Sequence, residues 1–395
     1  MTTRPSVARA AVATGTIALL LASCSVAPTE PPDNRPSVRP EETARPDETA
    51  VIAPVPTEAA AGITWSVRGT EGLPGILAGV SRDGDRFLAA AERTIYGSDD
   101  GLTWKPIADL PIGASRIHTL RRSGEWFVAG TIRVSADDGA VRLSSWVSRD
   151  GLNWQQLTGL AADPNLGPFG RLGDRWAAVS FDGLFVAGDA GGWQPIEGPK
   201  PFDRALVATA EGSVAFGVTR SVGAPTHFRA RVLFSDDAQS WVESTLSPGT
   251  ATIEAIAWGH ERYVVLGTVR EKPSAAVPDP NYDASAWWSE DGRTWAAGEI
   301  EQDPNANMLL GATIVPLAEG FVAIGYDIGT NAEILLMWSS ADGSTWRRLE
   351  TDTDVAYADV VDAICAEDRL MAFLTAGDGS TEVAVSDQPV ACPAR

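Results

Sequence analysis

The sequence predicts an all-β fold, a seven-bladed β-propeller built from four-stranded blades. Three observations carry this prediction. A seven-residue segment ending in tryptophan recurs along the chain, a pair of apolar runs precedes most copies, and an incomplete repeat stands at each end of the globular region. Repeats of about 40–50 residues that each hold four short strands are typical of propeller blades.

The recurring segment has the composition of a tight turn between the third and fourth strands of a blade. Its final tryptophans are separated by 50, 39, 48, 54 and 51 residues. Aspartate accepts backbone N–H bonds, glycine permits positive φ, and tryptophan buries a large ring. We therefore predict a structural role for Ser98, Asp100, Gly101, Trp104, Ser148, Asp150, Gly151, Trp154, Asp189, Trp193, Ser235, Asp237, Trp241, Ser289, Asp291, Gly292, Trp295, Ser340, Asp342, Gly343 and Trp346.

The first and second strands of a blade are predicted from the apolar runs that precede the turns, such as 253–256 and 262–267. Six modules carry a turn segment. A seventh begins at 359 and ends at 387 without a tryptophan, whereas 61–68 holds only the end of a turn and an outer strand. We predict that this N-terminal strand pairs with 383–387 and closes the ring, which leaves no open sheet between blades.

Two cysteines lie in the last module. Cys365 and Cys392 are an even pair, which usually bonds in an exported protein; free thiols are the alternative. A disulfide would tie the C-terminal tail to the inner part of the last blade. It would stabilise the fold by roughly 3 kcal/mol in the loop-entropy model.

The N-terminus has the features of a secretory leader. Arg4 and Arg9 precede an apolar run over 10–22, which is too short to span a bilayer. Residues 21–24, Leu-Ala-Ser-Cys, resemble the bacterial lipobox, in which the cysteine is lipidated after cleavage; an ordinary small-residue cleavage site is the alternative. We therefore predict a lipoprotein signal peptide over 1–23 and lipidation of Cys24.

The rest of the chain divides by composition. Residues 24–60 hold the lipidated cysteine and a proline- and acid-rich disordered tether, and 61–395 form the propeller. The net charge of −21 disfavours nucleic acid and anionic membrane surfaces as partners. We expect a monomer held by its lipid anchor at the outer face of the cytoplasmic membrane or the cell surface.

The turn segments resemble the Asp-box, or bacterial neuraminidase repeat. Related repeats occur in sialidases, xyloglucanase-type glycosidases, sortilin-like receptors and photosystem assembly factors. The resemblance implies that the turns lie on the propeller face opposite the active site, with calcium binding by a few of their aspartates as the alternative role. The Phe/Tyr-Arg-Ile-Pro segment of sialidases is missing, and its nearest match, Ser115–His118, lacks the aromatic residue and the proline.

Other catalytic chemistries find little support in the sequence. His118, His227 and His260 are scattered without metal-ligand spacing, and phosphate-binding glycine loops are absent. We therefore predict no metal and no cofactor, we interpret each histidine as an ordinary strand or loop residue, and we assign no catalytic residue.

A ligand is expected on the face opposite the turns, where the connections between second and third strands vary from blade to blade. The candidate ligand-binding residues are Arg133, Arg220, Arg270, Tyr282, Asp283, Tyr326 and Asp327. They favour a non-catalytic binding or assembly module for a glycan, a peptide or an envelope protein. The alternative is a glycoside hydrolase of sialidase-like or other type, which would require two facing carboxylates about 5 Å or 6.5–9.5 Å apart.

Overall fold

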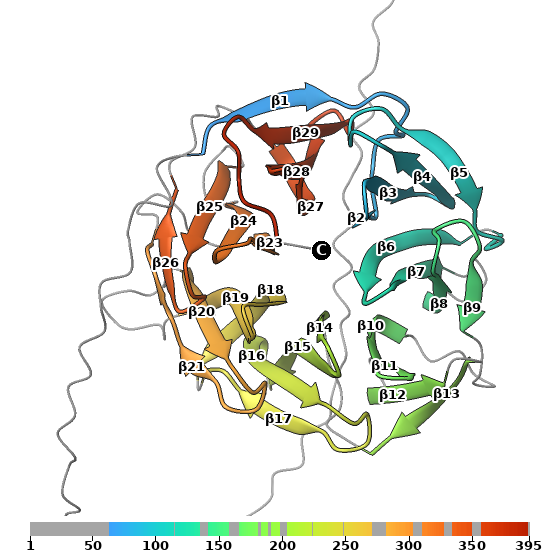
Figure 1. The fold of residues 1–395 in the computed structure, drawn as a ribbon. Coiled ribbons are helices and arrows are strands. Elements are labelled where there is room, and N and C mark those ends of the chain that lie inside the picture. Colours follow the sequence, from blue (N-terminus) through green and yellow to red (C-terminus); the bar gives the residue numbers. More distant parts are fainter. Residues whose placement is uncertain are drawn as a thin grey trace, which may run out of the picture. The chain divides into compact units, whose positions relative to one another are not determined.

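The computed structural model describes residues 63–113, 115–134, 141–157, 166–180, 183–188, 191–197, 204–222, 224–247, 249–270, 282–302, 310–327, 334–349 and 357–393. These residues form seven sheets arranged as a ring, which confirms the seven-bladed β-propeller (Figure 1). The predicted signal peptide, Cys24 and the tether lie outside the described residues. The described part contains no helix, and so none that is long and apolar enough to span a membrane.

The blades are numbered along the chain. Blades 1 to 3 contain β2 (Gly79–Asp83), β3 (Arg86–Ala91), β4 (Thr94–Ser98) and β5 (Lys105–Asp109); β6 (Arg116–Ser123), β7 (Trp126–Val134), β8 (Val141–Ser148) and β9 (Gln155–Leu157); and β10 (Leu166–Leu172), β11 (Arg175–Ser180), β12 (Gly183–Gly188) and β13 (Gly191–Ile196). Blades 4 and 5 contain β14 (Arg204–Ala210), β15 (Ser213–Val222), β16 (Ala224–Ser235) and β17 (Val242–Thr245); and β18 (Thr250–Gly259), β19 (Arg262–Arg270), β20 (Tyr282–Ser289) and β21 (Ala296–Ala297). Blade 6 contains β22 (Glu299–Ile300), β23 (Leu310–Pro316), β24 (Phe321–Asp327), β25 (Ile334–Ser340) and β26 (Thr345–Arg348), and blade 7 contains β27 (Tyr357–Ala366), β28 (Arg369–Ala376), β29 (Thr381–Ser386) and β1 (Trp65–Gly69).

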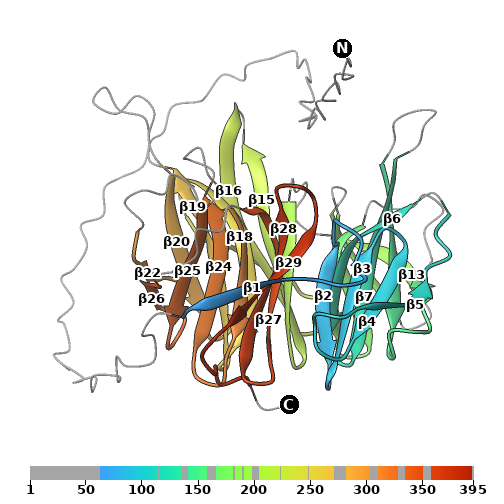
Figure 2. The same ribbon diagram turned by 90° about the horizontal axis from the view of Figure 1, so that it is seen from above.

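The antiparallel order of each blade defines two faces of the ring. The first strand lies at the centre and the last at the rim (Figure 1). Connections between first and second strands, and between third and fourth strands, emerge on one face, which we call the turn face. Connections between second and third strands emerge on the opposite face, the loop face, above which the β15–β16 hairpin projects (Figure 2).

Ring closure follows the prediction from the sequence. β1 pairs antiparallel with β29, from Trp65 opposite Ser386 to Gly69 opposite Glu382. The N-terminal strand therefore supplies the outer strand of blade 7, whose other three strands come from the C-terminus. Side-chain bonds reinforce this closure, since Gln388 Nε2 donates to Thr64 Oγ1 at 2.8 Å.

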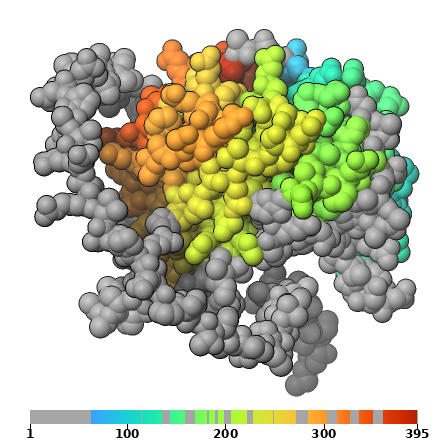
Figure 3. All heavy atoms as spheres, turned by 90° about the horizontal axis from the view of Figure 1, so that it is seen from below, coloured from blue at the N-terminus to red at the C-terminus, as the bar shows by residue number. Residues whose placement is uncertain are grey.

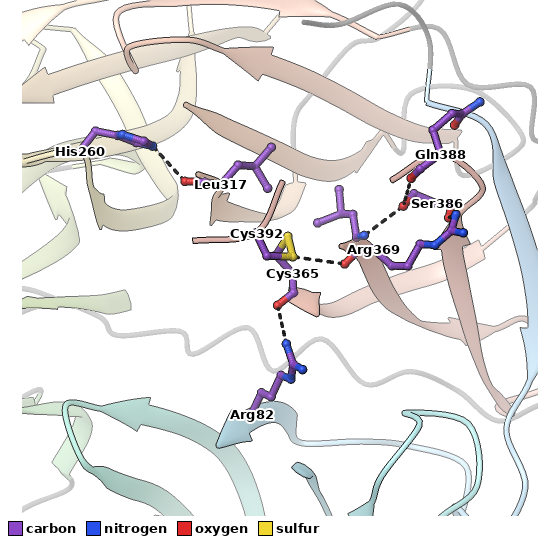
Figure 4. Close-up of a disulfide and its surroundings, with 9 residues drawn as sticks. Arg82, His260, Leu317, Cys365, Arg369, Ser386, Gln388 and Cys392 are labelled. Carbon is purple, nitrogen blue, oxygen red and sulfur yellow. Dashed lines mark hydrogen bonds between the residues drawn. A yellow bond between two sulfur atoms is a disulfide. The ribbon is translucent and has the colours of Figure 1, made fainter. Parts of the chain in front are cut away.

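The C-terminal tail runs from β29 along the turn face of blade 7 towards the centre. Val390 N donates to Asp368 O, and the tail's Ala391 O accepts a bond from Ala318 of blade 6. Cys392 forms the predicted disulfide with Cys365 at the end of the innermost strand β27 (Figure 4). The bridge thus joins residues 27 positions apart and anchors the tail to the inner part of the closing blade.

Blade 6 differs from the predicted four-stranded blade. The outer strand that follows the turn of blade 5 divides at Gly298, whose added Cβ would lie 2.6 Å from Ser344 O. Ala296–Ala297 pairs within blade 5, whereas Glu299–Ile300 crosses over and pairs parallel with β26. Blade 6 therefore has five strands, and the N–H of Glu299 donates to Ser344 O at 2.7 Å on this neighbouring edge.

The Ser-x-Asp-Gly segments form closed networks of hydrogen bonds. In the first copy, Ser98 Oγ donates to Asp100 Oδ1 and accepts from Gly101 N, both at 2.9 Å. Asp100 Oδ1 accepts from the N–H groups of Leu102 and Thr103 at 2.8 and 2.7 Å. The copies that begin at 148, 289 and 340 have the same bonds, and in all four the tryptophan Nε1 donates to the glycine carbonyl at 3.0–3.1 Å. Each turn therefore satisfies its own polar groups.

Each turn also packs on the blade before it in the ring. An added Cβ on Gly101 would lie 2.5 Å from Met371 of blade 7, and one on Gly292 would lie 2.1 Å from Phe234 of blade 4. Trp104 makes edge contacts with Phe373 of blade 7 at a centroid distance of 6.1 Å. The buried apolar side chains of the described residues accordingly form seven clusters, each shared by two adjacent blades.

Two copies of the turn depart from this pattern. In blade 4, Ala238 replaces glycine and keeps the positive φ, at 59°, and Trp241 Nε1 finds no acceptor among the described residues. In blade 3, Trp193 is buried, and Asp189 lies outside the described residues. Blades 4 and 5 are also joined by an ion pair between Arg293 and Asp236 at 2.6 Å. Their surfaces are continuous in Figure 3.

Substitution of Gly292 by alanine is expected to destabilise the protein strongly. The new methyl group would add left-handed backbone strain to a collision with Phe234, together about 2–5 kcal/mol. Gly173→Ala is the matched control, because Gly173 also has positive φ but nothing lies within 4 Å of the added Cβ. Urea unfolding should show the larger loss for Gly292→Ala; equal losses would contradict the packing role of the turn.

Removal of the disulfide in the double variant Cys365→Ser, Cys392→Ser should lower the free energy of unfolding by about 3–4 kcal/mol, because the unfolded chain regains the freedom of a loop of 27 residues. The denaturant midpoint of the oxidised protein, compared with that of the variant, measures this loss. Wild-type protein in reductant should move to the midpoint of the variant. A midpoint unchanged by both treatments would show that the tail does not contribute to closure.

Candidate ligand-binding sites

The candidate ligand-binding residues all lie on strands at the loop face of blades 2, 4, 5 and 6. The first three are arginines, at the end of β7 (Arg133), within β15 (Arg220) and at the end of β19 (Arg270). Tyr282 and Asp283 begin β20, and Tyr326 and Asp327 end β24; the side chains of Tyr282, Tyr326 and Asp327 lie outside the described residues. The structure therefore brings the seven residues to one face but spreads them over four blades. Their role in binding stays a prediction.

The segment that carries Arg220 is a strand hairpin rather than a variable connection. Cross-strand pairing of β15 and β16 places Arg220 opposite Arg229 and, after a register shift beyond Ser221, continues to Val222 opposite Ala224. Arg220 is therefore held by a strand rather than by a loop.

Two hairpins of the loop face place arginines directly opposite each other. Arg133 stands opposite Arg142 in blade 2, and Arg220 stands opposite Arg229 in blade 4. Like charges in directly opposed positions normally destabilise a sheet. Within the described ranges, no ion pair neutralises Arg133, Arg220 or Arg229. The loop face thus offers positive charge on a protein whose net charge is −21.

The turn face has different electrostatics, because its aspartates are already bonded. Hydrogen bonds from the N–H groups of Ser240 and Gln239 lower the pKa of Asp237 to about 2. The N–H and side chain of Asn153, followed by the N–H of Leu152, likewise lower the pKa of Asp150. In the part of the chain that the structure describes, no three His, Cys, Asp or Glu side chains are grouped to hold a metal ion.

A central cavity of about 1450 Å³ runs between the innermost strands of the blades. His118 and Arg121 line it from blade 2, Glu254 from blade 5 and Asp362 from blade 7, and Cys392 of the C-terminal tail lines it near the turn face. The volume exceeds the roughly 300–1,000 Å³ typical of small-molecule pockets. The cavity can therefore hold a ligand larger than a single sugar ring.

One wall of the cavity is acidic. Asp362 accepts hydrogen bonds from its neighbour Ala363 N at 2.9 Å, from Val80 N of blade 1 at 3.5 Å and from the hydroxyl of Thr313 in blade 6. Burial raises the pKa of Asp362 to about 6, although the charge of Arg121 acts in the opposite direction. The carboxyl therefore joins three adjacent blades at the centre of the ring. Glu254 on blade 5 is also buried.

Blade 2 contributes basic side chains to the same cavity. β6 has a register shift between Ile117 and Thr119, so His118 is the extra residue of a β-bulge. Bulges re-aim side chains and are common near functional sites. Ile117 and Leu120 are buried between blades 1 and 2, whereas His118 and Arg121 are exposed in the cavity.

The polar groups of the cavity were not among the residues predicted from the sequence to bind a ligand. His118 was interpreted as an ordinary strand or loop residue, and Glu254 and Asp362 were not singled out. A signal was present, because Glu254 and Asp362 interrupt apolar runs that the sequence assigns to innermost strands. His118 and Glu254 even occupy the same place, five residues before the end of β6 and of β18.

Replacement of Asp362 by asparagine should change how stability depends on pH. A carboxyl with a pKa of about 6 in the fold, against 3.8 ordinarily, stabilises the folded state most below pH ~4, and this contribution falls as the pH rises to ~6. Asn cannot ionise, so the variant lacks this loss. Its free energy of unfolding relative to that of wild type should therefore increase by on the order of 2 kcal/mol from acid to neutral pH. Urea unfolding at several pH values measures the difference.

Asp237→Asn is the control with the opposite sign. Because the pKa of Asp237 is lowered to about 2, its stabilising contribution is present above pH ~4 and is lost as the pH falls towards ~2. At neutral pH this variant should have a lower free energy of unfolding than wild type, and the difference should disappear in acid. Parallel pH profiles for wild type and Asp362→Asn would contradict the assignment of a buried, partly protonated carboxyl.

Comparison with known proteins supports the fold and leaves the activity open. No family model matches the chain, and no curated protein matches it. A chain of the mitotic checkpoint complex is 12% identical with a TM-score of 0.51, over 87% of this chain and 98% of that one. Polysaccharide lyase Uly1 is 10% identical with a TM-score of 0.50, over 85% and 94% of the two chains. At these identities the likeness shows a shared β-propeller fold, found both in enzymes and in proteins of macromolecular assemblies.

Proposed function

We propose that this protein is an extracytoplasmic, lipid-anchored propeller that binds a glycan, a peptide or an envelope protein without catalysis. The observation that carries the proposal is the contrast between the two faces. The described turns bond most of their own polar groups, whereas the loop face presents arginines that no described acid neutralises. A rigid ring with variable strand ends on one face is a suitable scaffold for recognition.

Further support comes from the repeat and from the N-terminal sequence. The shared hydrogen bonds of the Ser-x-Asp-Gly-x-Thr-Trp turns support membership of the Asp-box superfamily, which we propose for this chain. The lipobox-like segment ending at Cys24 and the tether to residue 60 would hold the propeller away from the membrane. A closed ring has no free sheet edge between blades, in keeping with a monomer.

A glycosidase or related carbohydrate-active enzyme is the second candidate. Asp362 and Glu254 line the same cavity, and a carboxyl with a pKa of about 6 suits a general acid. One of the similar structures is a polysaccharide lyase by name. Binding is favoured over catalysis because Asp362 already accepts bonds from blades 1 and 6, so its oxygens are engaged in holding the ring together.

Turnover of a panel of fluorogenic glycosides and polysaccharides by the full mature chain distinguishes the two candidates. We expect no hydrolysis or elimination above background, and binding of an immobilised glycan or envelope component that is weakened severalfold by Arg133→Gln or Arg220→Gln. Robust turnover that is abolished by Glu254→Gln or Asp362→Asn would replace the binding function with the enzymatic one. Arg149→Gln, on the turn face, is the control for the change in charge.

A further inference from the structure

Two side chains of blade 2, His118 and Arg121, line the central cavity and are exposed there. β6 carries Arg116, His118, Arg121 and Arg122 within seven consecutive residues. Of these, Arg122 forms an ion pair with Asp83 of blade 1. Arg116 and Arg121 form no ion pair or hydrogen bond with any described residue. We call His118 and Arg121 the blade 2 cluster; Arg116 lies on the same strand but is not among the residues that line the cavity.

The pKa of His118 is lowered, first by desolvation in the cavity and then by the positive charges of Arg116 and Arg121, so its imidazole is neutral beside Arg121. In the described part of the structure Arg121 has no carboxylate at ion-pair distance, although its charge acts on the carboxyl of Asp362. An anion in the cavity would therefore meet an arginine that no ion pair neutralises.

The fold itself does not require these side chains. Arg121 is the third residue from the end of its innermost strand, and the corresponding residues of four other blades are Ser81, Gly170, Ala208 and Ala257. Small residues serve the same structural position there. The arginine and the bulged histidine are therefore additions to blade 2 alone, and the small residues elsewhere leave space around the axis of the ring.

We propose that the blade 2 cluster binds the oxyanion of a ligand, a carboxylate, sulfate or phosphate group, inside the central cavity. This inference deepens the proposed binding function, on which it rests, by naming the charge of the ligand. The guanidinium of Arg121 offers a planar pair of N–H donors that fits an oxyanion, and neutral His118 can donate one more hydrogen bond. A cavity of about 1450 Å³ admits an acidic oligosaccharide as well as a free anion.

Inorganic sulfate tests the site before any natural ligand is known. An anion that binds only the folded state raises its stability. Wild-type protein should therefore gain more in melting temperature from sodium sulfate than from sodium chloride at equal ionic strength. Arg121→Gln should lose most of this extra gain, measured from the variant's own melting temperature without sulfate. Arg149→Gln changes the net charge equally on the turn face of the same blade and should keep the extra gain. Equal sulfate effects in wild type and Arg121→Gln would overturn the inference.

Titration calorimetry with three probes then separates the sources of the anion. An oligomer of galacturonic acid, a sulfated oligosaccharide and a neutral galactose oligomer of equal length are compared with inorganic sulfate. We expect at least one acidic probe to bind, with affinity reduced at least tenfold in Arg121→Gln and little changed in Arg149→Gln. A response to sulfate without binding of any saccharide would keep the anion site and remove the glycan function. Equal binding of the neutral and acidic oligomers would keep the glycan function and overturn the anion site.

Discussion

Closure of the ring is the constraint on which the rest of the structure depends. Every apolar cluster of the described residues is shared by two neighbouring blades. The apolar side chains of a blade are therefore buried only when both neighbouring blades are in place. The pairing of β1 with β29 provides that condition for the first and last blades. The disulfide and the hydrogen bonds of the C-terminal tail also hold blade 7 at its inner end. Loss of closure would expose apolar surface on blades 1 and 7 together.

The structural turns and the proposed recognition surface lie on opposite faces of this ring. On the turn face, the Ser, Asp and Trp side chains satisfy the donors and acceptors of their own turns while the glycine packs on the preceding blade. On the loop face, Arg220 stands opposite Arg229 at a cost in electrostatic energy. Departures from local consistency are expected at functional sites, where a ligand offsets the cost. The turn face is therefore built from polar groups that are already bonded, whereas the loop face holds opposed like charges.

The central cavity contains both a carboxyl that is bonded between blades and the side chains proposed to bind a ligand. Asp362 is engaged by three blades, so its carboxyl contributes to assembly and its elevated pKa records its burial. Within the described residues, Arg121 of the blade 2 cluster forms no ion pair. In the proposed site, the positive charge of Arg121 attracts an anion locally, against the net charge of −21 of the whole chain. A ligand that enters the cavity would therefore be oriented with its acidic end towards blade 2.

The sequence by itself determined the blades, the turns and the closure, whereas the cavity was decided only by the tertiary structure. A turn such as Ser98–Trp104 is made by seven consecutive residues, so its hydrogen bonds follow from local chemistry, and half-repeats at both ends dictate how the ring closes. The cavity residues His118, Glu254 and Asp362 come from strands more than 100 residues apart, and their aim depends on bulges and on neighbouring blades. The crossing of β22 into blade 6 likewise depends on a contact between Gly298 and Ser344 that no local pattern encodes. Local periodicity fixes which residues form a blade, but the space between blades arises only when all seven meet.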